Sequence, residues 1–141
     1  MTFEPTIISS RSGLKNAERK VHKACLDYVI ISVRGLCERK PYLVPRTHRP
    51  HRKGMLFLVF DDISESEDGY LMMTDVHAKS IVDFVSQNSD KIFICQCEAG
   101  QSRSLGIAAA IRASLHGDLS LSNEFPSDAS RYVYDMIIAN Y

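Results

Sequence analysis

Three short apolar runs constrain the fold of this chain more than any other feature of its sequence. They occupy residues 27–33, 55–60 and 91–95, and they are rich in β-branched and aromatic residues at odd and even positions alike. A strand that is apolar on both faces has to be covered on both faces, as in the parallel sheets of α/β proteins. The runs, with a further short strand at 6–10, therefore predict a mainly parallel central sheet.

Helical patterns separate and follow these runs. Apolar residues recur at helical spacing over 14–24, Thr74 can cap a second helix, a third spans 104–116 before Gly117, and Ser127 can cap the last. Alternating strands and helices indicate right-handed crossovers and a sheet flanked by helices on both sides. Residues 36–54, with three prolines, are expected to form a long loop.

Length and composition limit the number of domains and the location of the protein, but they do not identify a binding partner. The 141 residues, without a linker of low complexity, suit one domain spanning 1–141. The 17 basic and 17 acidic residues balance, so no global field recruits nucleic acid or an anionic membrane. We expect a cytoplasmic protein without a membrane span, because no export signal or long apolar segment is present and the four cysteines suit a reducing compartment.

The segment 94–104 carries the chemistry. It places Cys97 at a strand end, then a turn containing Gly100, then Arg103 at the start of a helix. A turn of this size can curl so that successive backbone N–H groups converge on one anion at the positive end of the helix. Arg103 can add a two-pronged hydrogen bond to a phosphoryl group, and the same environment favours the nucleophilic thiolate of Cys97.

The run 55–60 leads directly into Asp61 and Asp62. Ligands of parallel sheets bind beyond the carboxyl ends of the strands, so these carboxylates and the turn after Cys97 can line one cleft. Asp62 alternates with Leu58 and Phe60 along the strand, so it is the preferred candidate for the carboxylate that acts in this cleft. Asp61 and Asp68 are its competitors.

These residues resemble a known family. Cys97-Glu-Ala-Gly-Gln-Ser-Arg103-Ser104 matches the CX5R(S/T) loop of the protein tyrosine phosphatase superfamily, and looks closest to its dual-specificity branch. With Phe60-Asp-Asp-Ile63 and His77-Ala, the chain resembles compact bacterial and phage members over about residues 27–116. The resemblance implies a single-domain α/β fold, a phosphocysteine intermediate and no metal or other cofactor.

The resemblance also implies a role for each matching residue. Cys97 matches the nucleophile, Arg103 the phosphate-binding arginine, Asp62 the general acid, and Ser104 the hydroxyl that eases breakdown of the thiophosphate. The phosphate cradle corresponds to the backbone amides of Glu98, Ala99, Gly100, Gln101, Ser102 and Arg103. The family usually has histidine directly before the nucleophile, whereas this chain has Gln96.

Two other classes of function stay open at this stage. Gln96 suggests a phosphate-binding pseudophosphatase, and the same cradle could serve an arsenate reductase or an RNA 5′-phosphatase.

A phosphorylated protein or peptide is the preferred substrate, because Glu98 and Gln101 stand where lysines would suit phosphoinositides. The basic loop 46–53 could recruit RNA, although a solvated loop is the simpler interpretation.

The remaining cysteines point to packing rather than to a metal. Cys25, Cys37, Cys95 and Cys97 lack the paired spacing of a zinc site. Cys95 lies two positions before Cys97 and could form a protective disulfide with it, but a small core residue is the preferred interpretation.

Overall fold

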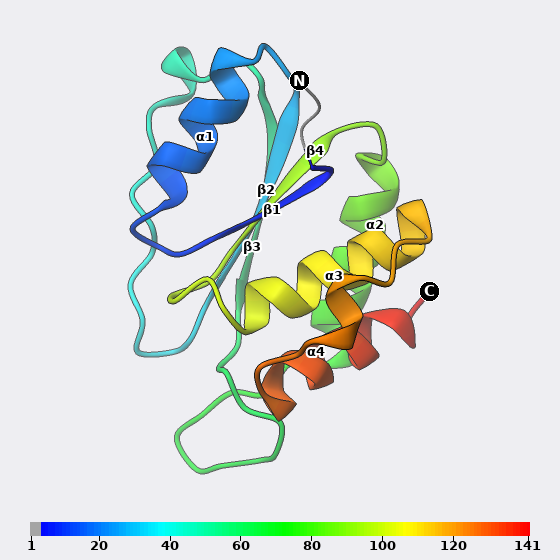
Figure 1. Ribbon diagram of the computed structural model, residues 1–141. Coiled ribbons are helices and arrows are strands. Elements are labelled where there is room, and N and C mark those ends of the chain that lie inside the picture. Colours follow the sequence, from blue (N-terminus) through cyan, green and yellow to red (C-terminus); the bar gives the residue numbers. More distant parts are fainter. Residues whose placement is uncertain (1–3) are drawn as a thin grey trace.

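A computed structural model describes residues 4–141 and shows one central sheet of four parallel strands. The strands are β1 (Thr6–Ser9), β2 (Tyr28–Arg34), β3 (Arg52–Val59) and β4 (Ile92–Gln96), in the spatial order β1-β4-β2-β3 (Figure 1). This confirms the predicted parallel sheet. All of its strands end at the same edge, which is where Cys97 follows β4 and Phe60 follows β3.

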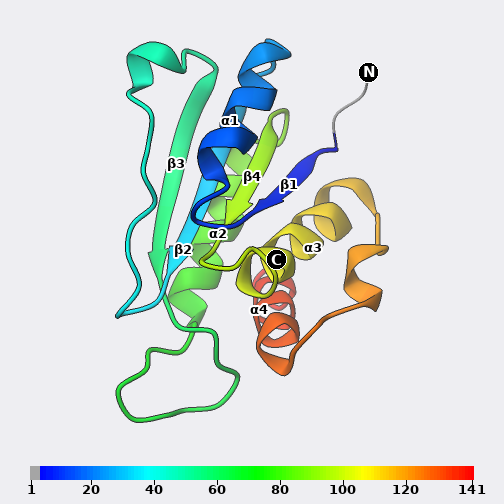
Figure 2. The same cartoon turned by 60° about the vertical axis from the view of Figure 1, so that its left-hand side comes forward.

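Helices cover both faces of the sheet. The helix α1 (Leu14–Lys23) lies on one face, whereas α2 (Asp75–Gln87), α3 (Arg103–His116) and α4 (Asp128–Ile138) lie on the other (Figures 1 and 2). The predicted α/β class is therefore correct. Within residues 4–141, no helix has the length and apolar character that a membrane crossing requires.

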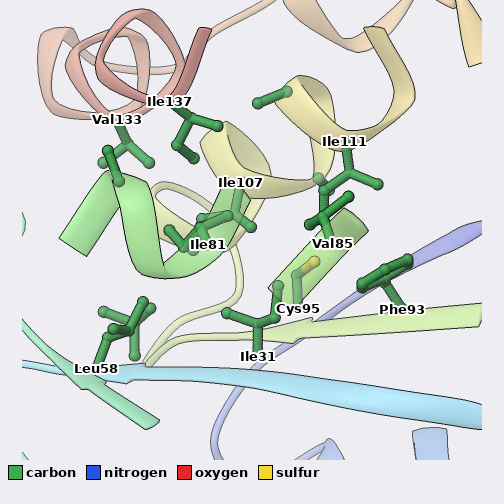
Figure 3. Packing of buried hydrophobic residues seen from close by; sticks show 14 of the residues in the cluster. Ile31, Leu58, Ile81, Val85, Phe93, Cys95, Ile107, Ile111, Val133 and Ile137 are labelled. Atoms are coloured by element: carbon green, nitrogen blue, oxygen red, sulfur yellow. The ribbon is translucent and has the colours of Figure 1, made fainter. Parts of the chain in front are cut away.

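The larger apolar core fills the space between the sheet and the three helices of one face. Figure 3 shows Ile31 of β2 and Cys95 of β4 pointing toward Ile107 of α3 and Ile81 of α2. Cys95 is fully buried in this core, and the burial raises the pKa of its thiol. Cys95 is therefore a packing residue, as the preferred interpretation held.

The run 55–60 differs from the prediction in its cover and in one boundary: it lies in the edge strand β3, where Met55 and Phe57 are exposed rather than buried. The loop expected over 36–54 ends earlier, because β3 begins at Arg52 rather than near Met55. Arg52 is buried although it is charged, since its Nε donates to Glu18 Oε2 at 2.6 Å and its Nη2 donates to Glu18 Oε1 at 2.9 Å. Tyr28 donates its hydroxyl to the same carboxylate at 2.6 Å. An ion pair between distant segments thus extends the strand.

We expect Arg52→Met to lower the free energy of unfolding by roughly 3 kcal/mol, because it leaves the buried Glu18 carboxylate without a cation. Urea unfolding at neutral pH measures the change. The matched control is Arg131→Met, which breaks an exposed pair with Asp135 and should cost at most about 0.5 kcal/mol. Equal losses in the two variants would contradict a structural role for the buried pair.

Candidate active site

The turn after β4 closes on the sulfur of Cys97. The sulfur lies 3.1 Å from Ser104 Oγ, and the backbone N–H of Ser104 approaches it at 3.4 Å. The two ends of the segment 97–104 therefore meet at one atom, with the residues between them forming a loop around it. Cys97 is only 1% exposed and also contacts the larger core.

The backbone amides of this turn have no acceptor among the described residues. None of the N–H groups of residues 98–103 donates a hydrogen bond to another group within 4–141. Gly100 has φ of +70° and lies so close to β1 and the residues after it that a Cβ atom would be 2.6 Å from the nitrogen of Ser10. Only glycine fits there, and consecutive free amides before a helix favour an anion.

Arg103 is held with one edge of its guanidinium free. It is 4% exposed, and its Nη1 and Nη2 atoms donate to the two carboxylate oxygens of Glu38 at 2.8 and 3.1 Å. Nη1 also donates to the carbonyl oxygen of Phe60 at 3.0 Å, while Nε is buried without a partner. The end of the guanidinium formed by Nη1 and Nη2 thus donates to acceptors of the protein itself. The edge formed by Nε and Nη2 keeps the geometry that binds two oxygens of one phosphoryl group.

Glu38 is the site residue that the sequence analysis missed. It lies in the loop after β2, and the hydrogen bonds from Arg103 hold the pKa of its carboxyl below the usual value. The pair's contribution to stability is therefore complete above the ordinary glutamate pKa and is lost as the pH falls through the lowered one. A buried arginine requires a carboxylate partner, and that requirement is the only signal in the sequence that could have suggested an acid here.

The two neighbouring aspartates have different surroundings. Asp62 is exposed, and its Oδ1 accepts a hydrogen bond from the Ser102 hydroxyl at 2.7 Å. Asp61 instead accepts backbone N–H bonds from Leu71 at 2.8 Å and Leu36 at 3.3 Å, so it braces two loops. The structure brings Asp62, and not Asp61, to the turn that follows Cys97.

Gln96 is part of a buried chain of hydrogen bonds below the turn. It is 1% exposed, its Oε1 accepts from the hydroxyl of Ser32 on β2, and its Nε2 donates to the carbonyl oxygen of Cys97 at 3.0 Å. The glutamine thus ties the start of the turn to the neighbouring strand. It does so without an ionisable ring.

Other predicted features lie away from this site. The loop 46–53 leads into the start of β3, at the opposite end of the parallel sheet from Cys97. Its Arg52 is buried against Glu18, and His51 pairs with Asp27 at 2.9 Å. Two of the basic side chains of the loop therefore already have acidic partners within the chain. No group of at least three histidine, cysteine or acidic side chains within residues 4–141 is arranged to hold a metal ion.

Glu98 is paired with Arg11 and is not an isolated charge. Its carboxylate accepts a hydrogen bond from Arg11 Nε at 3.0 Å, and its carbonyl oxygen accepts one from the Arg11 backbone N–H at 3.1 Å. Arg11 thereby offsets the negative charge next to the unpaired amides and fixes the outer side of the turn.

Neither a protein-family model nor a curated protein sequence matches the chain. Solved structures do match. PTPMT1 in complex with PI(5)P is 16% identical with a TM-score of 0.58, and the match covers 95% of this chain and 91% of that chain. The human tyrosine phosphatase-like serine/threonine/tyrosine-interacting protein is 16% identical with a TM-score of 0.57, covering 96% and 87%. Tk-PTP in the active form is 14% identical with a TM-score of 0.57, covering 96% and 90%.

These similarities extend over almost the whole chain and concern the arrangement of its strands and helices. The architecture of the whole chain, in which a strand precedes Cys97 and a helix begins at Arg103, thus agrees with the resemblance that the segment 97–104 indicated. The chain therefore has the fold of the protein tyrosine phosphatase superfamily, to which the dual-specificity phosphatases belong.

Proposed function

We propose that the chain is a cysteine-dependent phosphomonoester hydrolase that acts through a phosphocysteine intermediate. One observation carries the proposal: in the turn between the Cys97 sulfur and the Ser104 N–H that approaches it, the amides of 98–103 and the Nε of Arg103 have no acceptor within residues 4–141. A buried guanidinium N–H without a partner is costly, and an oxyanion in the turn would satisfy it together with the amides.

The reaction divides into two displacements on phosphorus. In the first, the Cys97 thiolate forms the S–P bond as the P–O bond of the substrate breaks, and Asp62 gives its proton to the leaving oxygen. In the second, the Asp62 carboxylate takes a proton from a water molecule that attacks phosphorus, and the S–P bond breaks. Ser104, whose hydroxyl is 3.1 Å from the sulfur, donates a hydrogen bond to the departing thiolate.

Rapid acid quench with a phosphorylated substrate tests this mechanism directly. A quench within the first turnover, at low pH where hydrolysis of the S–P bond is slower than its formation, should trap about one phosphate per chain bound covalently to Cys97. Mass spectrometry of the quenched protein locates the phosphate. Turnover that proceeds without any phosphocysteine would contradict the covalent route.

We expect Arg103→Lys to lower kcat/KM for p-nitrophenyl phosphate by roughly 100-fold, because lysine has neither a two-pronged edge for phosphate nor a second nitrogen for Glu38. The control is Arg131→Lys, an exposed position of α4 that forms one ion pair within residues 4–141, with Asp135. Steady-state kinetics measure both. Unchanged kcat/KM in Arg103→Lys would contradict the binding role of the guanidinium edge.

A phosphate-binding module without turnover is the second candidate, and Gln96 favours it. The superfamily histidine is replaced by a residue that cannot ionise, and one of the similar structures belongs to a protein described as phosphatase-like. The hydrogen bonds of Gln96 nevertheless support the shape of the turn. Tight binding of a phosphopeptide with neither phosphate release nor a phosphocysteine on acid quench would establish the module and overturn the hydrolase.

The substrate that we propose is a phosphorylated protein or peptide in the cytoplasm. PTPMT1 has been solved with PI(5)P, so a phosphoinositide is the alternative that a substrate panel should include. Four acidic residues line a shallow pocket beside the turn: Asp62, Glu65, Glu67 and Asp128. These carboxylates repel a headgroup with several phosphates and an anionic membrane more than they repel a single phosphorylated side chain.

A further inference from the structure

A second concave surface lies on the sheet face that carries α1. This helix packs Leu14 and Val21 against Tyr28 and Ile30, and thus covers the first half of β2. Beyond it, the last halves of β2 and β3 and the loop after β2 enclose a pocket of about 480 Å³. We call it the docking pocket; its lining includes Arg34, Lys40, Pro41, Leu43, Phe57 and Val59.

The docking pocket combines an apolar wall with positive charge. Phe57 belongs to the edge strand β3 and is 50% exposed, although it is a large aromatic residue. Arg34 and Lys40 are the charged residues of the lining, which contains no acid. Neither cation forms an ion pair with any group in residues 4–141. The surface therefore lacks both an apolar cover for Phe57 and a negative partner for its two cations.

The docking pocket is connected to the candidate active site by one residue. Arg34 Nη1 donates to the backbone carbonyl oxygen of Glu38 at 3.2 Å, and the carboxylate of Glu38 holds Arg103. A bound segment in the pocket would thus lie beside the loop that positions the phosphate-binding arginine. The acidic pocket that includes Asp62 lies next to Ser102 and Ser127 instead, so the two surfaces favour opposite charges.

We propose that the docking pocket binds an apolar side chain, flanked by acidic residues, of the protein whose phosphate the active site removes. Phe57, Leu43 and Val59 contact the apolar side chain, and Arg34 and Lys40 pair with the flanking carboxylates. This inference rests on the proposed function for the identity of the partner. Charge complementarity selects the acidic segment, because a basic one would place like charges against two unpaired cations.

Two variants and two matched controls test the docking pocket. Lys40→Glu reverses one of its cations and Phe57→Ser removes its exposed ring. Lys79→Glu makes the same charge reversal, and Val76→Ser replaces an exposed apolar side chain by serine, on the exposed side of α2 and on the opposite face of the sheet. The probe is a short unphosphorylated peptide with phenylalanine and leucine between glutamates, and its counterpart has lysines in place of the glutamates. Fluorescence anisotropy measures binding of the peptides. Hydrolysis of p-nitrophenyl phosphate, which has neither the apolar side chain nor the acidic flanks of the peptide, measures the activity of the active site separately.

The acidic peptide should bind the unaltered chain more tightly than the lysine peptide. Lys40→Glu and Phe57→Ser should each weaken its binding by roughly tenfold. The controls should bind normally, and all four variants should keep the kcat/KM for p-nitrophenyl phosphate and the melting temperature. Binding that depends on Lys40 and Phe57 supports the pocket even if the chain does not hydrolyse p-nitrophenyl phosphate, which would overturn only the hydrolase.

Other results would overturn the docking pocket. Equal binding of the acidic peptide by the unaltered chain and by both pocket variants would do so while leaving the hydrolase in place, as would preference for the lysine peptide. A monomer–dimer equilibrium in sedimentation velocity that both pocket variants abolish would assign the surface to a second copy of the chain. Binding to phosphatidylserine vesicles that Lys40→Glu abolishes, without binding of the acidic peptide, would assign it to a lipid surface.

Discussion

Replacing Cys97 by serine should abolish hydrolysis of p-nitrophenyl phosphate while leaving the binding of tungstate intact. A serine hydroxyl is a far weaker nucleophile than a thiolate, so we expect kcat to fall by more than roughly 10⁴-fold. Serine keeps the size and position of the side chain, and the amides of 98–103 and Arg103 are unchanged. Steady-state kinetic assays measure the fall in kcat, and calorimetry measures the dissociation constant of tungstate.

Cys25→Ser is the matched control for this loss. Cys25 is exposed and lies beyond the end of α1, so the exchange should not change kcat. Undiminished hydrolysis by Cys97→Ser would remove the nucleophile assignment. Loss of tungstate binding together with turnover would show that the exchange collapses the turn, and a Cys97→Ala variant that binds tungstate would then isolate the role of the sulfur.

Asp62→Asn should lower kcat by roughly 10³-fold with phenyl phosphate as substrate, because asparagine cannot give a proton to the leaving oxygen. The loss should be much smaller with p-nitrophenyl phosphate, whose leaving group departs as a stable anion without a proton. Asparagine can still accept the hydrogen bond from Ser102, so the position of the side chain is preserved. Parallel measurements of kcat with the two substrates give the ratio that reports on the general acid.

Asp68→Asn and Asp61→Asn complete this test. Asp68 is exposed in the same loop, and its exchange should leave both substrates unaffected. Asp61→Asn weakens the bonds to the backbone N–H groups of Leu36 and Leu71, so it should lower the melting temperature without changing the ratio between the substrates. A change of that ratio in Asp61→Asn but not in Asp62→Asn would assign the general acid to Asp61.

Much of the architecture could be predicted from local patterns. The runs at 27–33 and 91–95 and the helix at 104–116 were displaced by at most one residue at each end, because apolar periodicity and capping residues act over a few neighbouring positions. The start of β3 was missed, because Arg52 becomes compatible with a buried strand only when Glu18, from α1, supplies a carboxylate. Nothing near Arg52 in the sequence indicates that pair.

The same division holds for the candidate site. The spacing of Cys97, Gly100 and Arg103 between a strand and a helix was sufficient to predict a curled turn with free amides, since all of the required groups are adjacent in the chain. The tertiary structure alone decided which residues complete it: Glu38 aligns Arg103, Gln96 ties the turn to Ser32, and Asp62 rather than Asp61 reaches Ser102. These contacts join segments 40 to 65 residues apart. Their partners are set by the order of the strands in the sheet, and a single sequence carries no local signal of that order.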